Sequence, residues 1–188
     1  RTQTRAPPPP DVCSSDLERK RVPRPRQTYA AMITRLDRYV GEIMARLREL
    51  GLDEQTIVFF CSDNGATSKG SLGEFFGSNR PFQGWKGSLN EGGLRAPMIV
   101  CWPGRVAAGT VDDTPWAGWD ILPTLAELAG VTTLPPDLDG LSMAGALQGR
   151  VPPTRSHLYW EIPNRNALVQ AVRLGDLKAL RESAKAPI

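Results

Sequence analysis

The sequence predicts an α/β fold in which a mainly parallel sheet is flanked by helices, followed by a small antiparallel β-hairpin region. Three features lead to this prediction. An amphipathic helical pattern covers residues 29–50, and two short apolar runs, 56–61 and 97–102, are typical of strands buried on both faces. Further helical and strand patterns follow these runs. Their alternation favours a layered sheet over a bundle of helices.

The first predicted element is a helix that begins at Tyr29 and ends before Gly51. Its apolar residues recur at steps of three and four, so one stripe of the helix is expected to pack on a core. Gly51 suits the position after the last helical turn, where a left-handed backbone is common. The apolar positions are Met32, Ile33, Leu36, Tyr39, Val40, Ile43, Met44, Leu47 and Leu50.

A glycine-rich segment without sustained periodicity, residues 65–94, separates the two predicted strands. A loop of this length in a compact domain is usually either functional or a sign of a wrong assignment of elements, and we favour a functional loop. Beyond the second strand, Asp120 is predicted to cap a short helix, with Pro123 in the first turn and Gly130 after the end. Helical turns are expected at 142–147 and strands at 158–162, 168–174 and 177–180, the last two joined at Gly175-Asp176.

The N-terminal segment, residues 1–28, is expected to be disordered because it is rich in proline and poor in large apolar side chains. It holds seven basic and three acidic residues, whereas the rest of the chain holds 16 basic and 17 acidic ones. The basic balance therefore belongs to this segment, and no nucleic-acid partner is expected. Residues 11–17 would be encoded by GAC GTG TGC TCT TCC GAT CT, the end of a common sequencing adapter. This suggests the hypothesis that residues up to about 17 are artefactual.

Two places along the chain carry candidate chemistry. Asp63 and Asn64 directly follow the first predicted strand, at the sheet edge where ligands of α/β proteins bind. Their oxygens suit calcium or magnesium better than zinc, although Asp-Asn-Gly also makes a common tight turn. Lys86 lies among glycines in the long loop. It could bind an anionic group or simply be solvated.

The combination of these places resembles the type I sulfatase family of the alkaline-phosphatase-like superfamily. The segments that carry the resemblance are FCSDNG at 60–65, KGSLNEGGLRAP at 86–97 and WPG at 102–104, and weaker matches extend it over about 28–182. The resemblance implies hydrolysis of a sulfated small molecule or glycan. It also implies that Asp63 and Asn64 ligate a calcium ion and that Lys86 is a catalytic residue in contact with the sulfate. We further expect Glu91, Gly92, Gly93 and Arg95 to shape the loop, through close backbone approach and Glu-Arg pairing.

The family nucleophile is a formylglycine made from Cys or Ser in a Cys/Ser-x-Pro-x-Arg motif. Cys13 does not fit this motif because neither the proline nor the arginine follows it, so the nucleophile is expected to lie outside this chain. Residues 29–150 are then the C-terminal part of a sulfatase catalytic domain, and residues 151–188 the start of a truncated C-terminal subdomain. We expect the chain alone to be inactive.

Two alternatives to a sulfatase stay open at this point. One is a phosphoester or phosphonate hydrolase of the same superfamily, which would differ in its nucleophile, and the other is a non-catalytic interaction domain. No apolar run approaches the roughly 20 residues that a membrane-spanning helix needs, so no transmembrane segment is predicted. The family is often exported, which favours a periplasmic or secreted full-length protein. His157, the single histidine, is expected at the surface.

Overall fold

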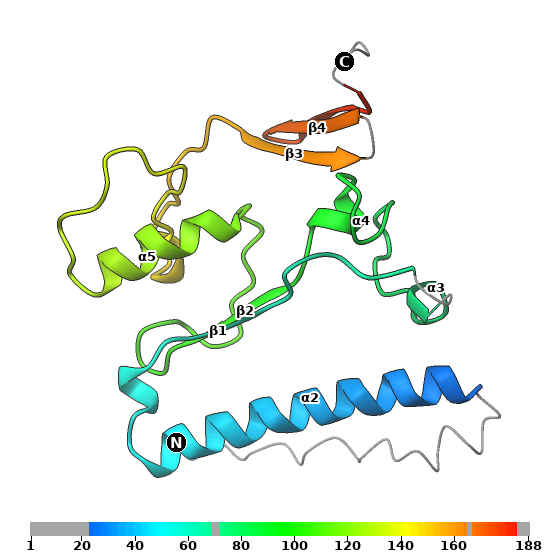
Figure 1. The fold of residues 1–188 in the computed structure, drawn as a ribbon. Coiled ribbons are helices and arrows are strands. Elements are labelled where there is room, and N and C mark those ends of the chain that lie inside the picture. Colours follow the sequence, from blue (N-terminus) through cyan, green and yellow to red (C-terminus); the bar gives the residue numbers. More distant parts are fainter. Residues whose placement is uncertain (1–22, 69–71, 165–166, 184–188) are drawn as a thin grey trace. The chain divides into compact units, whose positions relative to one another are not determined.

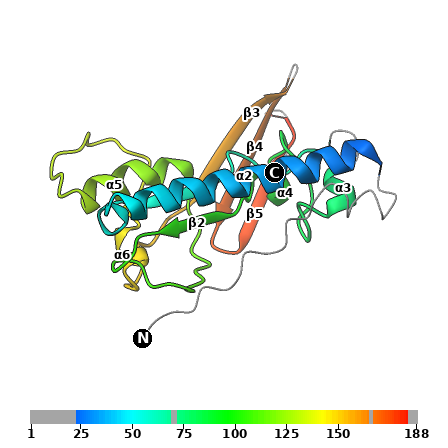
Figure 2. The same cartoon turned by 90° about the horizontal axis from the view of Figure 1, so that it is seen from below.

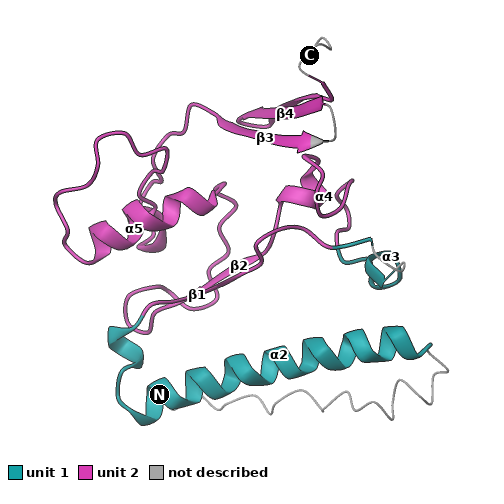
Figure 3. Ribbon diagram, viewed as in Figure 1, with its two compact units in different colours: residues 1–56, 67–78 teal, residues 57–66, 79–188 magenta. Residues whose placement is uncertain are grey.

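The computed structural model describes residues 23–68, 72–164 and 167–183 (Figure 1). The chain divides into two compact units, coloured separately in Figure 3. Unit 1 comprises residues 1–56 and 67–78, and unit 2 comprises residues 57–66 and 79–188. Each unit is described by itself.

Unit 1 is built around the helix α2 (Arg24–Glu49), which begins at Arg24 rather than at Tyr29. Part of the segment expected to be disordered is therefore helical, while residues 1–22 lie outside the described residues. Pro25 is tolerated because it lies in the first turn, where the missing N–H would have no helical partner. The predicted end is confirmed: Gly51 has φ 64°, and the N–H of Leu52 bonds to the carbonyl of Leu47.

The apolar stripe of α2 is not buried, which corrects the expectation that it packs on a core. No residue of the helix is buried, and Met32 is 64% exposed and Ile43 58% exposed. Among the described elements, α2 contacts only the 3-10 helix η1 (Asp53–Gln55) and the short helix α3 (Leu72–Phe76). An apolar stripe is buried only by a second layer, and the described part of unit 1 does not contain one.

Unit 2 begins with the strands β1 (Val58–Cys61) and β2 (Met98–Cys101), which pair antiparallel. The α/β class is confirmed, but no described strand pair is parallel, so the expected parallel pairing is absent from this part of the chain. Parallel neighbours need a long crossover, usually a helix that packs on the sheet. The described residues of the connection here form only α3 and α4 (Glu91–Leu94), with five and four residues. The expectation that these two strands are buried on both faces is also wrong, since Ile99 in β2 is 62% exposed.

The remainder of unit 2 follows the predicted order. The 3-10 helix η3 (Gly118–Asp120) leads into α5 (Ile121–Leu128), and α6 (Ala144–Leu147) follows. A three-stranded antiparallel sheet then forms in the order β3-β4-β5, which confirms the C-terminal antiparallel region (Figure 2). Its strands are Leu158–Asn164, Ala167–Leu174 and Leu177–Arg181, and the β4–β5 turn contains Gly175 at φ 54°.

Asp120 is the polar centre of this unit, with an exposed fraction of 0%. It precedes α5 as predicted, but its side chain does not cap that helix. Its carboxylate instead accepts hydrogen bonds from the N–H groups of Ala117 and Leu141, at 2.7 and 2.9 Å. The guanidinium of Arg155 forms an ion pair with the same carboxylate, at 2.5 Å. One buried carboxylate therefore ties α5 to two later segments.

The two faces of the C-terminal sheet differ in chemistry. Because side chains alternate along a strand, Tyr159, Glu161, Gln170 and Arg181 share one face, where they form a hydrogen-bonded network. The hydrogen bond that Tyr159 donates to Glu161 raises the pKa of the phenol above its ordinary value. We name the opposite face the inner face. It carries Leu158, Trp160, Ile162, Val169, Ala171, Arg173, Lys178 and Leu180.

Candidate functional site

The turn after β1 presents the two predicted metal ligands. The side chain of Asp63 is exposed, and that of Asn64 is half-buried. Ser62 stabilises the turn by donating its hydroxyl to the carbonyl of Asn64 at 2.8 Å. The amide nitrogen of Asn64 donates to the carbonyl of Gly65 at 3.2 Å, which leaves the amide oxygen available as a ligand. The turn therefore offers a carboxylate and an amide oxygen from adjacent residues.

The glycine-rich loop lies against this turn. The N–H of Lys86 donates to the carbonyl of Ala66, and the N–H of Gly65 donates to the carbonyl of Gly93, both at 2.8 Å. The backbone of Lys86 is thus held beside the segment that carries Asp63 and Asn64. The Lys86 side chain is exposed. The three residues predicted for the site come from segments that the structure brings together.

Close backbone contact depends on the glycines of the loop, as expected for Gly92 and Gly93. A Cβ atom on Gly65 would lie 1.9 Å from the carbonyl oxygen of Gly92. On Gly92 it would lie 2.3 Å from the carbonyl oxygen of Gly84, and on Gly93 2.2 Å from that of Ser88. A larger residue at position 65 would push the loop away from the turn, and one at position 92 or 93 would distort the loop itself.

We therefore expect Gly93→Ala to lower the free energy of unfolding of unit 2 by about 1–3 kcal/mol, the usual cost of overpacking. The two nearest atoms, the carbonyl oxygens of Ser88 and Trp85, belong to the backbone and cannot move aside cheaply. Urea denaturation followed by tryptophan fluorescence measures the change. Gly118→Ala is the matched control, since a Cβ there meets nothing within 4 Å. Equal stability of the two variants would contradict the tight contact.

Glu91 anchors the loop to the inner face of the sheet. Its carboxylate lies 2.7 Å from the ammonium of Lys178 and 3.8 Å from the guanidinium of Arg173. The expected pairing of Glu91 with Arg95 is therefore wrong, because Glu91 pairs with Lys178 and Arg173 instead. Arg95 instead stacks over the ring of Phe82, at 4.7 Å from its centroid.

Sequence reasoning missed Lys178 and Arg173, although a signal was present. The two cations are direct partners in the β4–β5 hairpin. Like charges directly opposite on a sheet are destabilising, so the pair indicates a nearby carboxylate. Glu91 supplies that carboxylate from 87 positions away along the chain.

A second match to the nucleophile motif was also missed. Cys101-Trp102-Pro103-Gly104-Arg105 has the Cys-x-Pro-x-Arg spacing. In the structure, Cys101 pairs with Val58 at the start of β1, whereas Asp63 follows the end of that strand. With about 3.3 Å per strand residue, the two lie at opposite ends of the ribbon. Cys101 is therefore not positioned to react at this turn, and a nucleophile outside the chain stays a prediction.

The described residues do not contain a complete metal centre. No group of three or more His, Cys, Asp or Glu side chains among them is arranged to bind a metal ion. Calcium takes about six to eight oxygen ligands, so Asp63 and Asn64 can supply only some of them. His157 is exposed, as expected, beside the hydroxyl of Ser156. No described helix combines the length and apolar character needed to cross a membrane.

The sulfatase family model matches residues 3–131. The chain belongs to the sulfatase family. The match begins inside the N-terminal segment, and the artefactual origin of residues up to about 17 stays a hypothesis.

Curated sulfatases are similar to this sulfatase chain over most of its length. Steryl-sulfatase of Mus musculus is 40% identical over 150 residues, which cover 77% of this chain and 24% of that protein. Arylsulfatase A of Homo sapiens is 36% identical over 157 residues, which cover 82% of this chain and 30% of that protein. The sulfatase chain thus spans 24% and 30% of the lengths of these two relatives.

Solved structures confirm the fold of the sulfatase chain. The crystal structure of Ps i-CgsB in complex with k-i-k-neocarrahexaose matches with a TM-score of 0.76 and 28% identity. The match covers 95% of this chain and 40% of that chain. It supports the α/β, alkaline-phosphatase-like class predicted from the sequence.

Proposed function

We propose that this chain is the C-terminal piece of a sulfuric ester hydrolase that cleaves sulfate esters with the help of calcium. One observation carries the proposal: the hydrogen bond from Lys86 to Ala66 holds a cationic residue beside the Asp63-Asn64 turn. A sulfate ester needs such a combination, because negative charge develops on its oxygens during cleavage. Membership of the sulfatase family supports the same reaction.

Asp63 and Asn64 would hold the calcium ion as part of its ligand set. The fit rests on their chemistry, because both supply hard oxygen atoms and the carboxylate of Asp63 is exposed. Calcium bound there would withdraw electron density from the sulfate group. The ammonium group of Lys86 would bind a sulfate oxygen and offset its charge. The formylglycine nucleophile is expected elsewhere in the full-length protein.

The proposed substrate is a sulfated small molecule or glycan. The related proteins include a steryl-sulfatase and an N-acetylgalactosamine-6-sulfatase, whose names cover both classes. We also propose a periplasmic or secreted location for the full-length protein, from the usual export of the family.

Calcium titration of the ¹⁵N-labelled chain tests the proposed ligands. We expect weak binding, with a dissociation constant of about 10⁻³ M or higher, because the ligand set is incomplete. NMR shifts should centre on residues 62–66 and disappear in Asp63→Ala. Asp112→Ala is the matched control, since Asp112 is an exposed carboxylate that caps its own loop at Thr114. Tight calcium binding that survives Asp63→Ala would place the ion elsewhere.

Turnover is a separate test of the same proposal. The chain alone should show no hydrolysis of an aryl sulfate above that of its Lys86→Ala variant, because the nucleophile is expected to lie outside this chain. Measurable turnover that depends on Lys86 would contradict the proposed incomplete site.

A further inference from the structure

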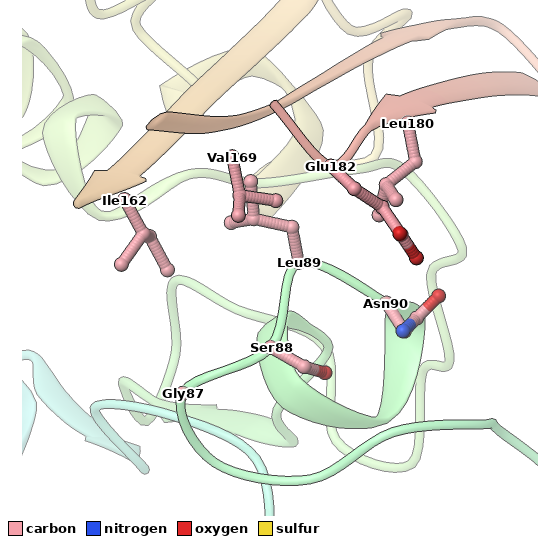
Figure 4. Close-up of a pocket in the computed structure, with 8 residues that line it drawn as sticks. All are labelled: Gly87, Ser88, Leu89, Asn90, Ile162, Val169, Leu180 and Glu182. Carbon is pink, nitrogen blue, oxygen red and sulfur yellow. The ribbon is translucent and has the colours of Figure 1, made fainter. Parts of the chain in front are cut away.

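A pocket of about 360 Å³ lies between residues 87–90 and the inner face of the C-terminal sheet (Figure 4). Its sheet side is apolar, with Ile162 and Val169 paired across β3 and β4, and Leu180 from β5. Its other side is the backbone that directly follows Lys86. The pocket volume lies within the roughly 300–1,000 Å³ typical of small-molecule sites. The pocket therefore adjoins the residue proposed to bind sulfate.

Two polar side chains border the pocket with unused hydrogen-bonding capacity. Asn90 occupies the position before α4, yet its side chain makes no capping hydrogen bond. The carboxylate of Glu182 takes part in none of the ion pairs formed by the described residues. Figure 4 shows both side chains on the same side of the pocket, where Glu182 points toward Asn90. A donor-rich ligand would meet an amide and a carboxylate there.

The pocket is fixed in shape by the contacts around it. Leu89 is 2% exposed and points toward Val169 in Figure 4. The ion pair between Glu91 and Lys178 ties the next residues of the loop to β5. Ala171, at the centre of the inner face, is also only 2% exposed. A pocket held open by packed residues on both sides does not have to form when its ligand arrives.

We infer that this pocket binds the uncharged, hydroxyl-bearing ring of the sulfate ester while its sulfate group lies at Lys86. This inference rests on the proposed function. The apolar wall can cover the C–H face of such a ring, and Asn90 and Glu182 can bond to its hydroxyl groups. The charge of Glu182 disfavours a second sulfate at this position. The pocket thus selects a polar, neutral ring over a flat apolar alcohol.

NMR titration of the ¹⁵N-labelled 188-residue chain tests this inference. The probes are methyl β-D-galactopyranoside as an uncharged ring, phenol as an apolar alcohol, and sodium sulfate alone. The galactoside should give saturable shifts at residues 87–90 and at Ile162, Val169 and Leu180. Asn90→Ala and Glu182→Ala should each weaken its binding about fivefold, the effect of losing one hydrogen bond.

The control variant is Tyr159→Phe, which removes a hydroxyl from the opposite face of the sheet and should leave galactoside binding unchanged. Asn90 and Glu182 are exposed, and the dispersion of each spectrum reports whether the variant is folded. Absence of saturable galactoside binding, stronger binding of phenol, or full binding by both pocket variants would overturn the inference.

The sulfate titration separates this inference from the proposed function. Sulfate shifts at Lys86 that vanish in Lys86→Ala, without galactoside binding, would overturn the pocket assignment and leave the sulfatase proposal in place. Galactoside binding without a response to either sulfate or calcium would overturn both, because the pocket would then have no reacting group beside it.

Discussion

Replacing Asp120 with alanine is expected to lower the free energy of unfolding of unit 2 by about 3–5 kcal/mol, the cost of breaking a buried ion pair. Arg155, only 14% exposed, would lose the carboxylate that neutralises it. Its Nε atom is buried and already has no hydrogen-bond partner. The N–H groups of Ala117 and Leu141 would also lose their acceptor, and each unsatisfied group adds to the penalty.

Urea denaturation followed by tryptophan fluorescence measures this loss, because all five tryptophans lie in unit 2. Glu127→Ala is the matched control. Its carboxylate is 3.9 Å from the guanidinium of Arg150, and both side chains are more than half exposed. Removing this ion pair should therefore lower the free energy of unfolding by less than about 1 kcal/mol. If the two variants were equally stable, Asp120 would not be the polar centre of the unit.

The individual elements could be predicted because the patterns that specify them are local. The stripe of α2 and the β4–β5 turn at Gly175 need only a few neighbouring residues to be recognised. The start of α2 was missed because proline was taken as a sign of disorder. Pro25 instead lies in the first helical turn, and Pro23 lies just before it. Proline is compatible with a helix at both positions.

Strand pairing could not be predicted from the same patterns. An apolar run of four to six residues looks the same whether its partner is parallel or antiparallel. The length of the connection between β1 and β2 did not decide between parallel and antiparallel pairing either, because the described residues of the glycine-rich loop form only the short helices α3 and α4. Burial of Ile99 and of the α2 stripe also depends on layers that the described residues do not contain.

The geometry of the candidate site could be predicted where it depends on short motifs, but not where it depends on long-range contacts. Glycines in sequence signalled the close approach of Gly65 and Gly93, because only glycine permits it. The pairing of Glu91 with Lys178 joins residues far apart in sequence, so no local pattern contains it. Asp120 shows a related ambiguity, because a helix cap and a buried ion-pair partner have the same local sequence.

Replacing Lys86 with alanine in the full-length enzyme is expected to lower kcat/KM for a sulfate ester by about 10²–10³-fold, as when a single preorganised group that stabilises charge is removed. The Lys86 ammonium would meet charge that grows on the sulfate oxygens, so its loss should appear in kcat as well as in KM. Lys86→Arg should recover part of the activity, because it keeps the charge but not the compact shape of an ammonium. Steady-state kinetics of the three proteins measure these effects.

Two further variants distinguish sulfate binding from metal binding and from a general loss of positive charge. Asp63→Ala should lose both calcium binding and activity, whereas Lys86→Ala should keep its calcium affinity, because the lysine is not a ligand. Arg105→Ala removes an exposed cation that stacks on Trp102 beyond the far end of β2, and its activity should stay within about twofold of the parent. If Lys86→Ala were as active as Arg105→Ala, the lysine would be an ordinary solvated side chain and the sulfate would bind elsewhere.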